Sequence, residues 1–200
     1  MPWLEIAPLC IDQVAGEQPA HFPRVQAKLA YDVAALYIIF QVVDRYVRAT
    51  AESYQDQVCE DSCVEFFFTP GEDFSHGYFN MEVNCGGMVL FHHQKGRKLD
   101  DVPVSEPDFE QVKIAHTLPK IVHPEIDEAL TWVVEYRLPF AILSSYARID
   151  TPSPGVRWRA NLYKCADGCS HPHWLTWSPV ILPVPDFHRP EFFGHLMFES

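Results

Sequence analysis

The sequence has 200 residues, of which 48% are hydrophobic and 14% aromatic, and this is enough apolar material for the core of one domain. Its formal net charge of −12 argues against nucleic acid or an anionic membrane surface as a partner, because both would repel the chain. We expect a single domain over residues 1–200, since no linker interrupts the sequence. The opening residues lack the basic n-region of a leader, which predicts a cytoplasmic protein as written; an exported protein with a trimmed leader is the alternative.

Segments rich in Val, Ile, Phe, Tyr and Trp recur along the chain and are separated by Pro, Gly, Asp and Asn, which is typical of β-strands. Pro139 suits the first turn of a helix, so one short helix is predicted over 139–146. The pattern favours an all-β fold, a two-sheet antiparallel β-sandwich of the jelly-roll or immunoglobulin-like kind with at most a short helix. The expected strands span 25–31, 35–43, 62–69, 78–85, 88–93, 110–118, 130–138, 156–164 and 194–199.

The segment YFNMEVNC at 78–85 alternates apolar and polar residues. Its odd-numbered positions are apolar, so Asn80, Glu82 and Asn84 fall together on the opposite face of the strand. Asn and Glu are poor strand residues, so this polar face costs stability that Thr or Val would not. Such a face indicates a role for these side chains beyond strand formation.

Two further segments carry polar side chains within strand-like runs. In 156–164 Arg159 and Asn161 lie opposite the apolar positions, and in 62–69 Glu65 interrupts an otherwise apolar strand, where a carboxylate needs a partner. One interpretation is that these faces are the solvated outer sides of a sandwich. The other is that they converge into an array of donors and acceptors suited to sugar hydroxyls, and we favour it.

Five motifs stand out along the chain: DSCVEFFF at 61–68, NMEVNCGG at 80–87, WRANLYK at 158–164, HPHWLTWSP at 171–179 and DFHRPEFFG at 186–194. In order and spacing they resemble the family 9-like carbohydrate-binding modules, which are DOMON-like β-sandwiches. The resemblance spans about residues 25–198 and implies a non-catalytic, often calcium-stabilised sandwich that grips a saccharide and takes part in polysaccharide catabolism beside glycoside hydrolases.

The resemblance also implies roles for individual residues. Glu65 resembles the acid that accepts from sugar hydroxyls, and Asn84 the polar floor beside it. Trp174 or Trp177 is expected to form one aromatic wall. We add Glu82, Arg159 and Asn161 as hydrogen-bonding residues, with His171 or His173 beside the tryptophans and His188 and Arg189 as candidates for the rim.

The sequence departs from the family where the second aromatic wall should stand. In the sugar-gripping members an aromatic residue lies six positions before the acid, and here Cys59 holds that place. Tyr54 and Tyr78 are the nearby candidates to replace it. The departure keeps a second function class open, a structural or protein-interaction sandwich that has lost the sugar site.

The sequence also contains residues that could form a catalytic carboxylate pair, a metal site or a disulfide. Glu65 and Glu82 could be the paired carboxylates of a glycosidase. Structural calcium could bind Asp56, Glu60 and Asp61, which supply hard oxygen ligands before a strand. A zinc site on Cys165, Cys169, His171 and His173, and disulfides Cys59–Cys63 or Cys165–Cys169, are weaker alternatives. The sequence does not indicate an oligomeric state.

Overall fold

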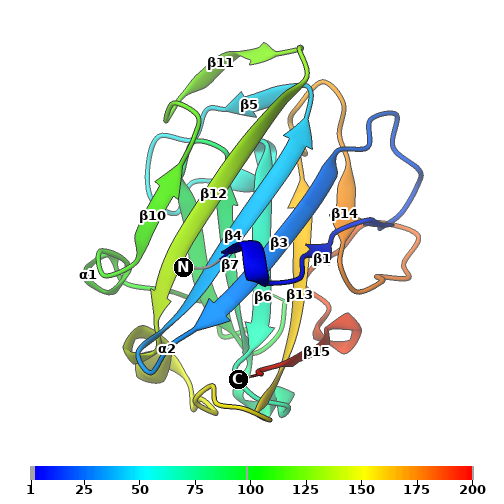
Figure 1. Cartoon of the computed structure of the whole chain (residues 1–200). Coiled ribbons are helices and arrows are strands. Elements are labelled where there is room, and N and C mark those ends of the chain that lie inside the picture. The colour runs from blue at the N-terminus through cyan, green and yellow to red at the C-terminus, as the bar shows by residue number, and fades with distance from the viewer. Residues whose placement is uncertain (1–2, 98, 200) are drawn as a thin grey trace.

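Two antiparallel β-sheets face each other in the computed structural model, which describes residues 3–97 and 99–199 (Figure 1). The smaller sheet has the order β1-β3-β4-β12-β10 and the larger one β2-β14-β13-β6-β7-β8-β9, with β15 also pairing with β13. A two-stranded ribbon, β5 with β11, closes one end. The bounds of the smaller sheet's strands are β1 Leu9–Cys10, β3 Arg24–Tyr31, β4 Ala35–Asp44, β10 Lys113–His116 and β12 Leu130–Pro139, and those of the ribbon are β5 Val47–Ala49 and β11 Val122–Ile126.

The larger sheet contains the longest motifs of the sequence. Its strands are β2 Gln13–Val14, β6 Cys63–Thr69, β7 Tyr78–Asn84, β8 Val89–Gln94, β9 Val102–Pro103, β13 Arg157–Cys165, β14 Trp174–Thr176 and β15 Gly194–Met197. The α-helices are α1 Glu106–Phe109 and α2 Phe140–Tyr146, and single 3-10 turns occur at Trp3–Glu5, Val58–Glu60, Phe74–His76 and Pro190–Phe192.

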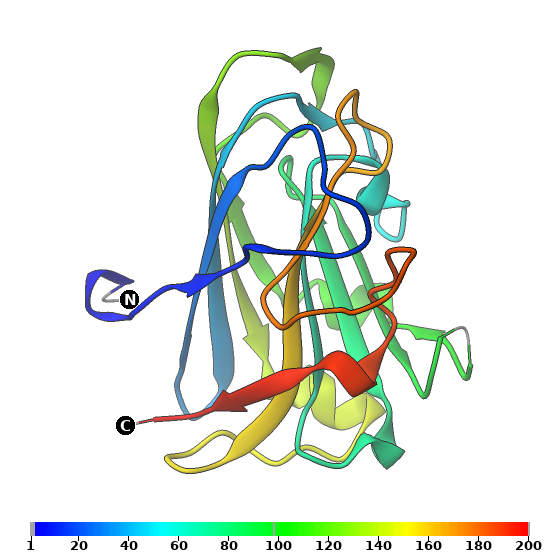
Figure 2. The ribbon, with the colours of Figure 1, turned by 90° about the vertical axis from the view of Figure 1, so that its right-hand side faces the viewer.

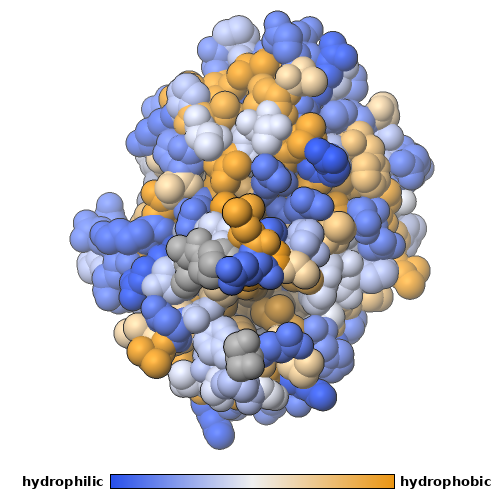
Figure 3. Space-filling model, viewed as in Figure 1, coloured by the Kyte–Doolittle hydropathy of each residue, from blue (hydrophilic) through white to orange (hydrophobic). Residues whose placement is uncertain are grey.

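The main core lies between the two sheets and follows from the alternation of side chains. Phe79, Met81 and Val83 of β7 meet Trp158 and Leu162 of β13 in this core, all without solvent exposure. The predicted inward faces of both strands are therefore confirmed. The opposite, outward face of β3, β4 and β12 is a mixed surface on which hydrophilic residues break up the apolar patches (Figure 3), as is usual for the solvent side of an antiparallel sheet.

The outer face of the larger sheet is not solvated. Phe67 and Tyr163 on that face pack against Val180, Phe187 and Phe193 from the C-terminal segments in a second core. Figure 2 shows the sandwich from the side, with these orange and red segments alongside the larger sheet. Strands β6 and β7 are consequently buried on both faces, and their polar side chains lie inside the protein.

The predicted all-β, two-sheet antiparallel sandwich is confirmed, and each of the nine expected strands is present with slightly different bounds. The expected helix is α2, which begins directly after Pro139. A second, four-residue helix, α1, was not predicted; Ser105 caps it and Pro107 stands in its first turn. None of the helices in the described part of the chain is long and apolar enough to cross a membrane.

Candidate functional site

A cavity of about 220 Å³ opens on the outer face of the larger sheet. Strands β6, β7 and β13 supply its floor, and loops on either side supply its walls. Its volume is below the roughly 300 Å³ at which pockets for drug-sized molecules begin, so it suits a small ligand. It is lined by Cys59, Glu65, Phe67, Glu82, Arg97, Cys165, Asp167, Trp174, Pro185, Asp186, Phe187 and His188.

Two carboxyl groups lie side by side on the floor. Glu65 of β6 is directly opposite Glu82 of β7 in the strand register, and the two residues are only 2% and 6% exposed. Burial, followed by the negative charge of Glu82, raises the pKa of Glu65 well above its ordinary value. Burial also raises the pKa of Glu82 to about 7. Near neutral pH the pair therefore retains protons and can both donate and accept hydrogen bonds.

Neighbouring side chains hold these carboxyl groups in place. Asn80 Nδ2 donates to Glu82 Oε1 at 3.0 Å, and the Cys165 thiol donates to Glu65 Oε1 at 3.0 Å. Gln94 Nε2 in turn donates to Asn80 Oδ1 at 2.8 Å. The floor is thus preorganised before any ligand arrives.

His188 is neutral in this environment. Burial is the main reason that its pKa is lowered to about 4, and the positive charge of Arg97 adds to the effect. Its Nδ1 lies 3.0 Å from Tyr78 Oη and 3.2 Å from Gln94 Nε2, two groups that can donate to it. With Nδ1 as acceptor, the proton sits on Nε2, and His188 offers the cavity a neutral donor.

The walls combine an indole with charged groups. Trp174 is half-buried, and its Nε1 donates to Asp167 Oδ1 at 2.8 Å, which fixes the orientation of the ring. Arg97 Nη1 lies 2.7 Å from Asp186 Oδ2, so the guanidinium is paired within the wall. An indole beside carboxyl, imidazole and guanidinium groups combines an apolar surface with hydrogen-bonding groups.

The sequence model described as carbohydrate-binding family 9 matches residues 4–198, nearly the whole chain. The chain belongs to carbohydrate-binding family 9. No curated protein matches this family 9 chain significantly.

Solved structures have the same fold. A Bacteroides uniformis protein assigned as carbohydrate-binding superposes with a TM-score of 0.89 at 29% identity, over 98% of this family 9 chain and 88% of its own. A family 9 module from Caldicellulosiruptor kristjanssonii in complex with glucose gives a TM-score of 0.64 at 14% identity over 99% and 86% of the two chains. The same type of module in complex with cellotriose gives 0.65 at 12% identity over 99% and 85%.

The structure brings together three of the eight predicted ligand-binding residues of this family 9 chain: Glu65, Glu82 and Trp174 all line the cavity. Cys59 lines it too, at the place where the family has an aromatic residue, and of the two rim candidates only His188 does. The lining residues that were not predicted for the site are Phe67, Arg97, Cys165, Asp167, Pro185, Asp186 and Phe187. All of them except Phe67 lie in loops or at a strand end, where alternation carries no signal.

The two asparagines predicted for the site form hydrogen bonds with backbone groups instead. Asn84 Oδ1 accepts from the Gly86 and Met88 amides at 3.1 and 2.8 Å. Asn161 Nδ2 donates to Ser178 O at 2.9 Å, and Asn161 Oδ1 accepts from Ser178 N at 2.8 Å. Both asparagine side chains are fully buried and outside the cavity lining, so their bonding capacity is used within the fold.

The remaining predicted residues, Arg159, His173 and Trp177, also lie outside the cavity lining. Arg159 Nε donates to Phe193 O at 3.1 Å and thereby anchors the C-terminal segment. Trp177 packs against the main core. In this family 9 chain these three side chains are therefore not placed at the cavity.

His173 belongs to a buried charged cluster inside the sandwich. Its Nε2 lies 2.7 Å from Lys164 Nζ, and its Nδ1 lies 3.0 Å from His171 O. Burial, followed by the charge of Lys164, lowers the pKa of His173 to about 3. Lys164 in turn faces the carboxylate of Asp44, which also accepts from the indole of Trp132. The cluster is structural because each member has a partner within it.

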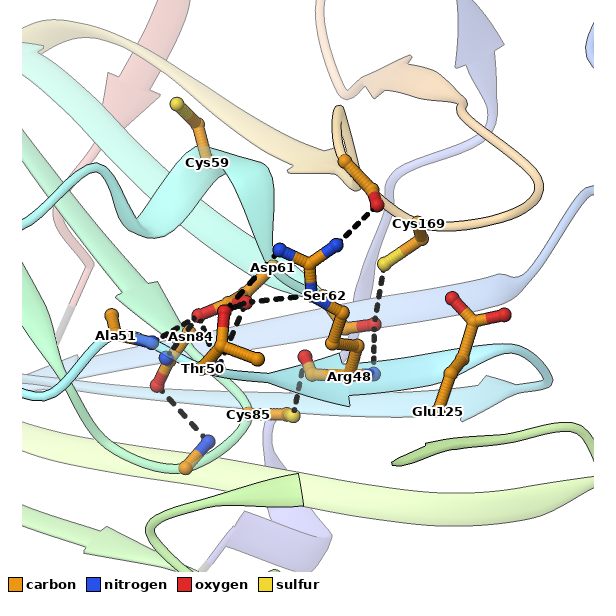
Figure 4. A network of polar contacts seen from close by, with 12 residues as sticks. Arg48, Thr50, Ala51, Cys59, Asp61, Ser62, Asn84, Cys85, Glu125 and Cys169 are labelled. Carbon is orange, nitrogen blue, oxygen red and sulfur yellow. Dashed lines mark hydrogen bonds and ion pairs between the residues drawn. The ribbon is translucent and has the colours of Figure 1, made fainter. Parts of the chain in front are cut away.

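The expected calcium ligands do not form a coordination sphere. Asp61 is saturated: its oxygens accept from the Thr50 and Ala51 amides and from Asn84 Nδ2 at 2.9 to 3.0 Å, with Arg48 Nε at 3.5 Å (Figure 4). Asp56 Oδ2 caps the local turn by accepting from backbone amides at 2.9 Å. Among the described residues, Asp56, Glu60 and Asp61 do not come within ligand distance of one another. This carboxylate set does not fit calcium.

The structure also forms neither the zinc site nor the disulfides that the sequence suggested. Cys169 Sγ lies 3.7 Å from Ser62 Oγ, and His171 stacks on Tyr46 with ring centroids 3.6 Å apart, away from the thiol of Cys165. All six cysteines of this family 9 chain are free thiols. In the register, Cys165 is opposite Cys63, so neither predicted pairing matches the strand arrangement.

Proposed function

We propose that this chain binds a saccharide without cleaving it, in the cavity between Trp174 and the Glu65–Glu82 floor. One observation carries the proposal: an oriented indole stands beside a buried pair of carboxyl groups that retains protons near neutral pH. Membership of a carbohydrate-binding family supports it. So do the modules of the same fold that were solved in complex with glucose and cellotriose.

The chemistry of the cavity suits sugar hydroxyls, each of which donates one hydrogen bond and accepts others. The protonated carboxyl pair can do both, and His188 adds a neutral donor. The apolar face of a pyranose ring can stack on the indole of Trp174. The site holds one indole, and Cys59 stands where the second wall is expected, so the affinity should be weak, about micromolar to millimolar.

Neither tyrosine proposed as a substitute wall lines the cavity. Tyr54 stacks on Phe109 with ring centroids 4.1 Å apart, and Tyr78 is engaged with His188. Phe187 lines the cavity but stacks on Tyr163 with ring centroids 4.0 Å apart. We therefore assign the stacking role to Trp174 alone.

Binding is favoured over hydrolysis by the protonation of the floor. A retaining glycosidase needs one ionised carboxylate as nucleophile beside a protonated acid. Here burial raises the pKa of both Glu65 and Glu82, so neither is held as the fully ionised carboxylate that a nucleophile must be near neutral pH. We include in the proposal a supporting role in polysaccharide catabolism, beside enzymes that cleave the saccharide.

The test is a titration with glucose, cellobiose, cellotriose and xylo-oligosaccharides, followed by tryptophan fluorescence. Trp174→Ala and Glu65→Ala should each abolish the response of the native chain. Trp177→Ala is the matched control, because Trp177 lies outside the cavity, and it should keep the response. If a folded chain responds to no saccharide, the proposal fails and a protein-interaction role replaces it. Equal loss in Trp177→Ala and Trp174→Ala would contradict the assigned cavity.

A further inference from the structure

We propose that Cys63, Glu65 and Cys165 form a binding site for a thiophilic divalent cation such as Zn²⁺ at the floor of the cavity. The two sulfur atoms and a carboxylate oxygen of Glu65 all lie within 4.8 Å of one another. Among the described residues, this is the one group of three such side chains that are close enough to share an ion. The site goes beyond saccharide binding and uses two thiols, Cys63 and Cys165, to which the proposed recognition assigns no contact with the saccharide.

The strand pairing explains why the three side chains converge. In the antiparallel register of β6 and β13, Cys63 is directly opposite Cys165. Glu65 follows Cys63 by two positions, so alternation places it on the same face of β6. Both strands lie between two cores, and all three residues are at least nine-tenths buried. The group is therefore held by rigid elements, as a metal site requires.

The distances are close to those of a tetrahedral zinc site. With Zn–S of about 2.3 Å and Zn–O of about 2.1 Å, ligand atoms lie roughly 3.5 to 4 Å apart. Small side-chain rotations would bring the three ligand atoms to these separations. In the metal-free chain the Cys165 thiol proton points to Glu65 Oε1 at 3.0 Å, so a hydrogen bond links two of the proposed ligands.

The electrostatics also suit a cation. Two thiolates and one carboxylate would leave a zinc complex with a charge of about −1, and the Lys164 ammonium is near enough to favour the charged forms of Cys63 and Glu65. Cysteine binds a metal as the thiolate, so binding releases the thiol protons and the affinity should rise with pH.

The site would be open on one side. Glu65 and Cys165 both line the cavity, whereas Cys63 lies behind them. A tetrahedral ion with three protein ligands keeps one position for a water molecule or a ligand hydroxyl, the arrangement of open rather than closed zinc sites.

The experiment is a Co²⁺ titration of the reduced full chain, followed by the thiolate-to-cobalt charge-transfer absorption, with Zn²⁺ added afterwards as competitor. We expect one equivalent of Co²⁺ to give the band and Zn²⁺ to abolish it. Cys63→Ser and Cys165→Ser should each weaken binding by about 100-fold or more. Loss of a ligand should cost at least as much metal affinity as loss of an outer-shell partner, which costs up to about 100-fold. Cys85→Ser and Cys169→Ser are matched controls, because both thiols are buried but outside the group, and they should leave the band unchanged.

Three results would overturn the site: no charge-transfer band in the reduced native chain, a band that survives in Cys63→Ser and Cys165→Ser, or equal loss in the control variants. A Cys63–Cys165 disulfide in peptide maps of a chain that binds no Co²⁺ after reduction would show a redox pair instead. If the serine variants do not fold, Glu65→Gln provides the second measurement: the Zn²⁺-dependent rise in Tm of the native chain should be lost in it. A saccharide titration repeated in chelator separates the two proposals, since saccharide binding does not depend on the ion.

Discussion

Lys164 Nζ lies 3.6 Å from Asp44 Oδ2, and both side chains are completely excluded from solvent. The lysine comes from β13 and the aspartate from β4, so the ion pair joins the two sheets through the interior of the sandwich. The attraction of Lys164 and the hydrogen bond from His21 outweigh the effect of burial and hold the pKa of Asp44 far below its ordinary value.

Removing one partner of this pair should destabilise the fold strongly. Lys164→Met leaves the Asp44 carboxylate buried without its countercharge, and the expected loss in the free energy of unfolding is about 3–5 kcal/mol. Urea denaturation measures it. The double variant Lys164→Met/Asp44→Asn should regain much of that loss, because no charge is then left unpaired. A double variant as unstable as the single one would show that packing, not charge, sets the cost.

The floor carboxyls should make stability fall as the pH rises. Because the folded pKa of Glu82 is raised to about 7, folding favours its neutral form, and this contribution is lost as the pH rises through about 7. Glu82→Gln stays neutral, so relative to the native chain it should gain about 2–3 kcal/mol between about pH 5 and pH 8. Urea denaturation at several pH values measures the difference. A difference that does not change with pH would contradict the raised pKa.

His188 should act with the opposite sign. Its folded pKa is lowered to about 4, so its contribution to stability is present above the unfolded value of about 6.5 and is lost as the pH falls toward 4. The native chain should therefore lose about 1.4 kcal/mol per pH unit relative to His188→Gln over that range. Urea denaturation of the two chains between about pH 4 and pH 7 measures the slope, and a difference that does not change with pH would contradict the lowered pKa.

Asn161 should matter for folding and not for ligand binding. Asn161→Ala removes the bonds to both backbone groups of Ser178, which lie in a part-buried position, at a cost of about 1–3 kcal/mol. The saccharide affinity of the folded variant should equal that of the native chain, because Asn161 does not line the cavity. Thermal unfolding and the fluorescence titration check the two parts separately. A selective loss of saccharide affinity would place Asn161 in the site after all.

The long strands could be predicted from sequence because alternation over seven or more residues is a strong local signal, as in β7 and β13. The six strands that were missed have two to five residues each, and pairing across the fold defines them more than local pattern does. The buried position of Lys164 could also have been predicted from alternation along its strand, but it was not. Lys164 shares the inward parity of Trp158 and Leu162, which by itself indicates a buried lysine.

Only part of the site could be predicted. Glu65 and Glu82 stand out as carboxylates within strands, and Trp174 follows from the family resemblance. Asp167 and His188 come from loops whose path is set by tertiary packing. Asn84 and Asn161 lie on the polar faces of their strands, as binding residues would. The structure shows that Asn84 bonds instead to backbone amides of the turn that follows its strand, and Asn161 to the backbone of Ser178.

The middle layer formed by β6, β7 and β13 belongs to two cores at once, and it also supplies the floor of the cavity. In the loops of the walls, Phe187 is a core residue, whereas Asp167, Pro185 and Asp186 are not. New specificities can therefore be sought by varying Asp167, Pro185 and Asp186 at small cost in stability, while substitutions in the floor would lower the stability of the whole sandwich.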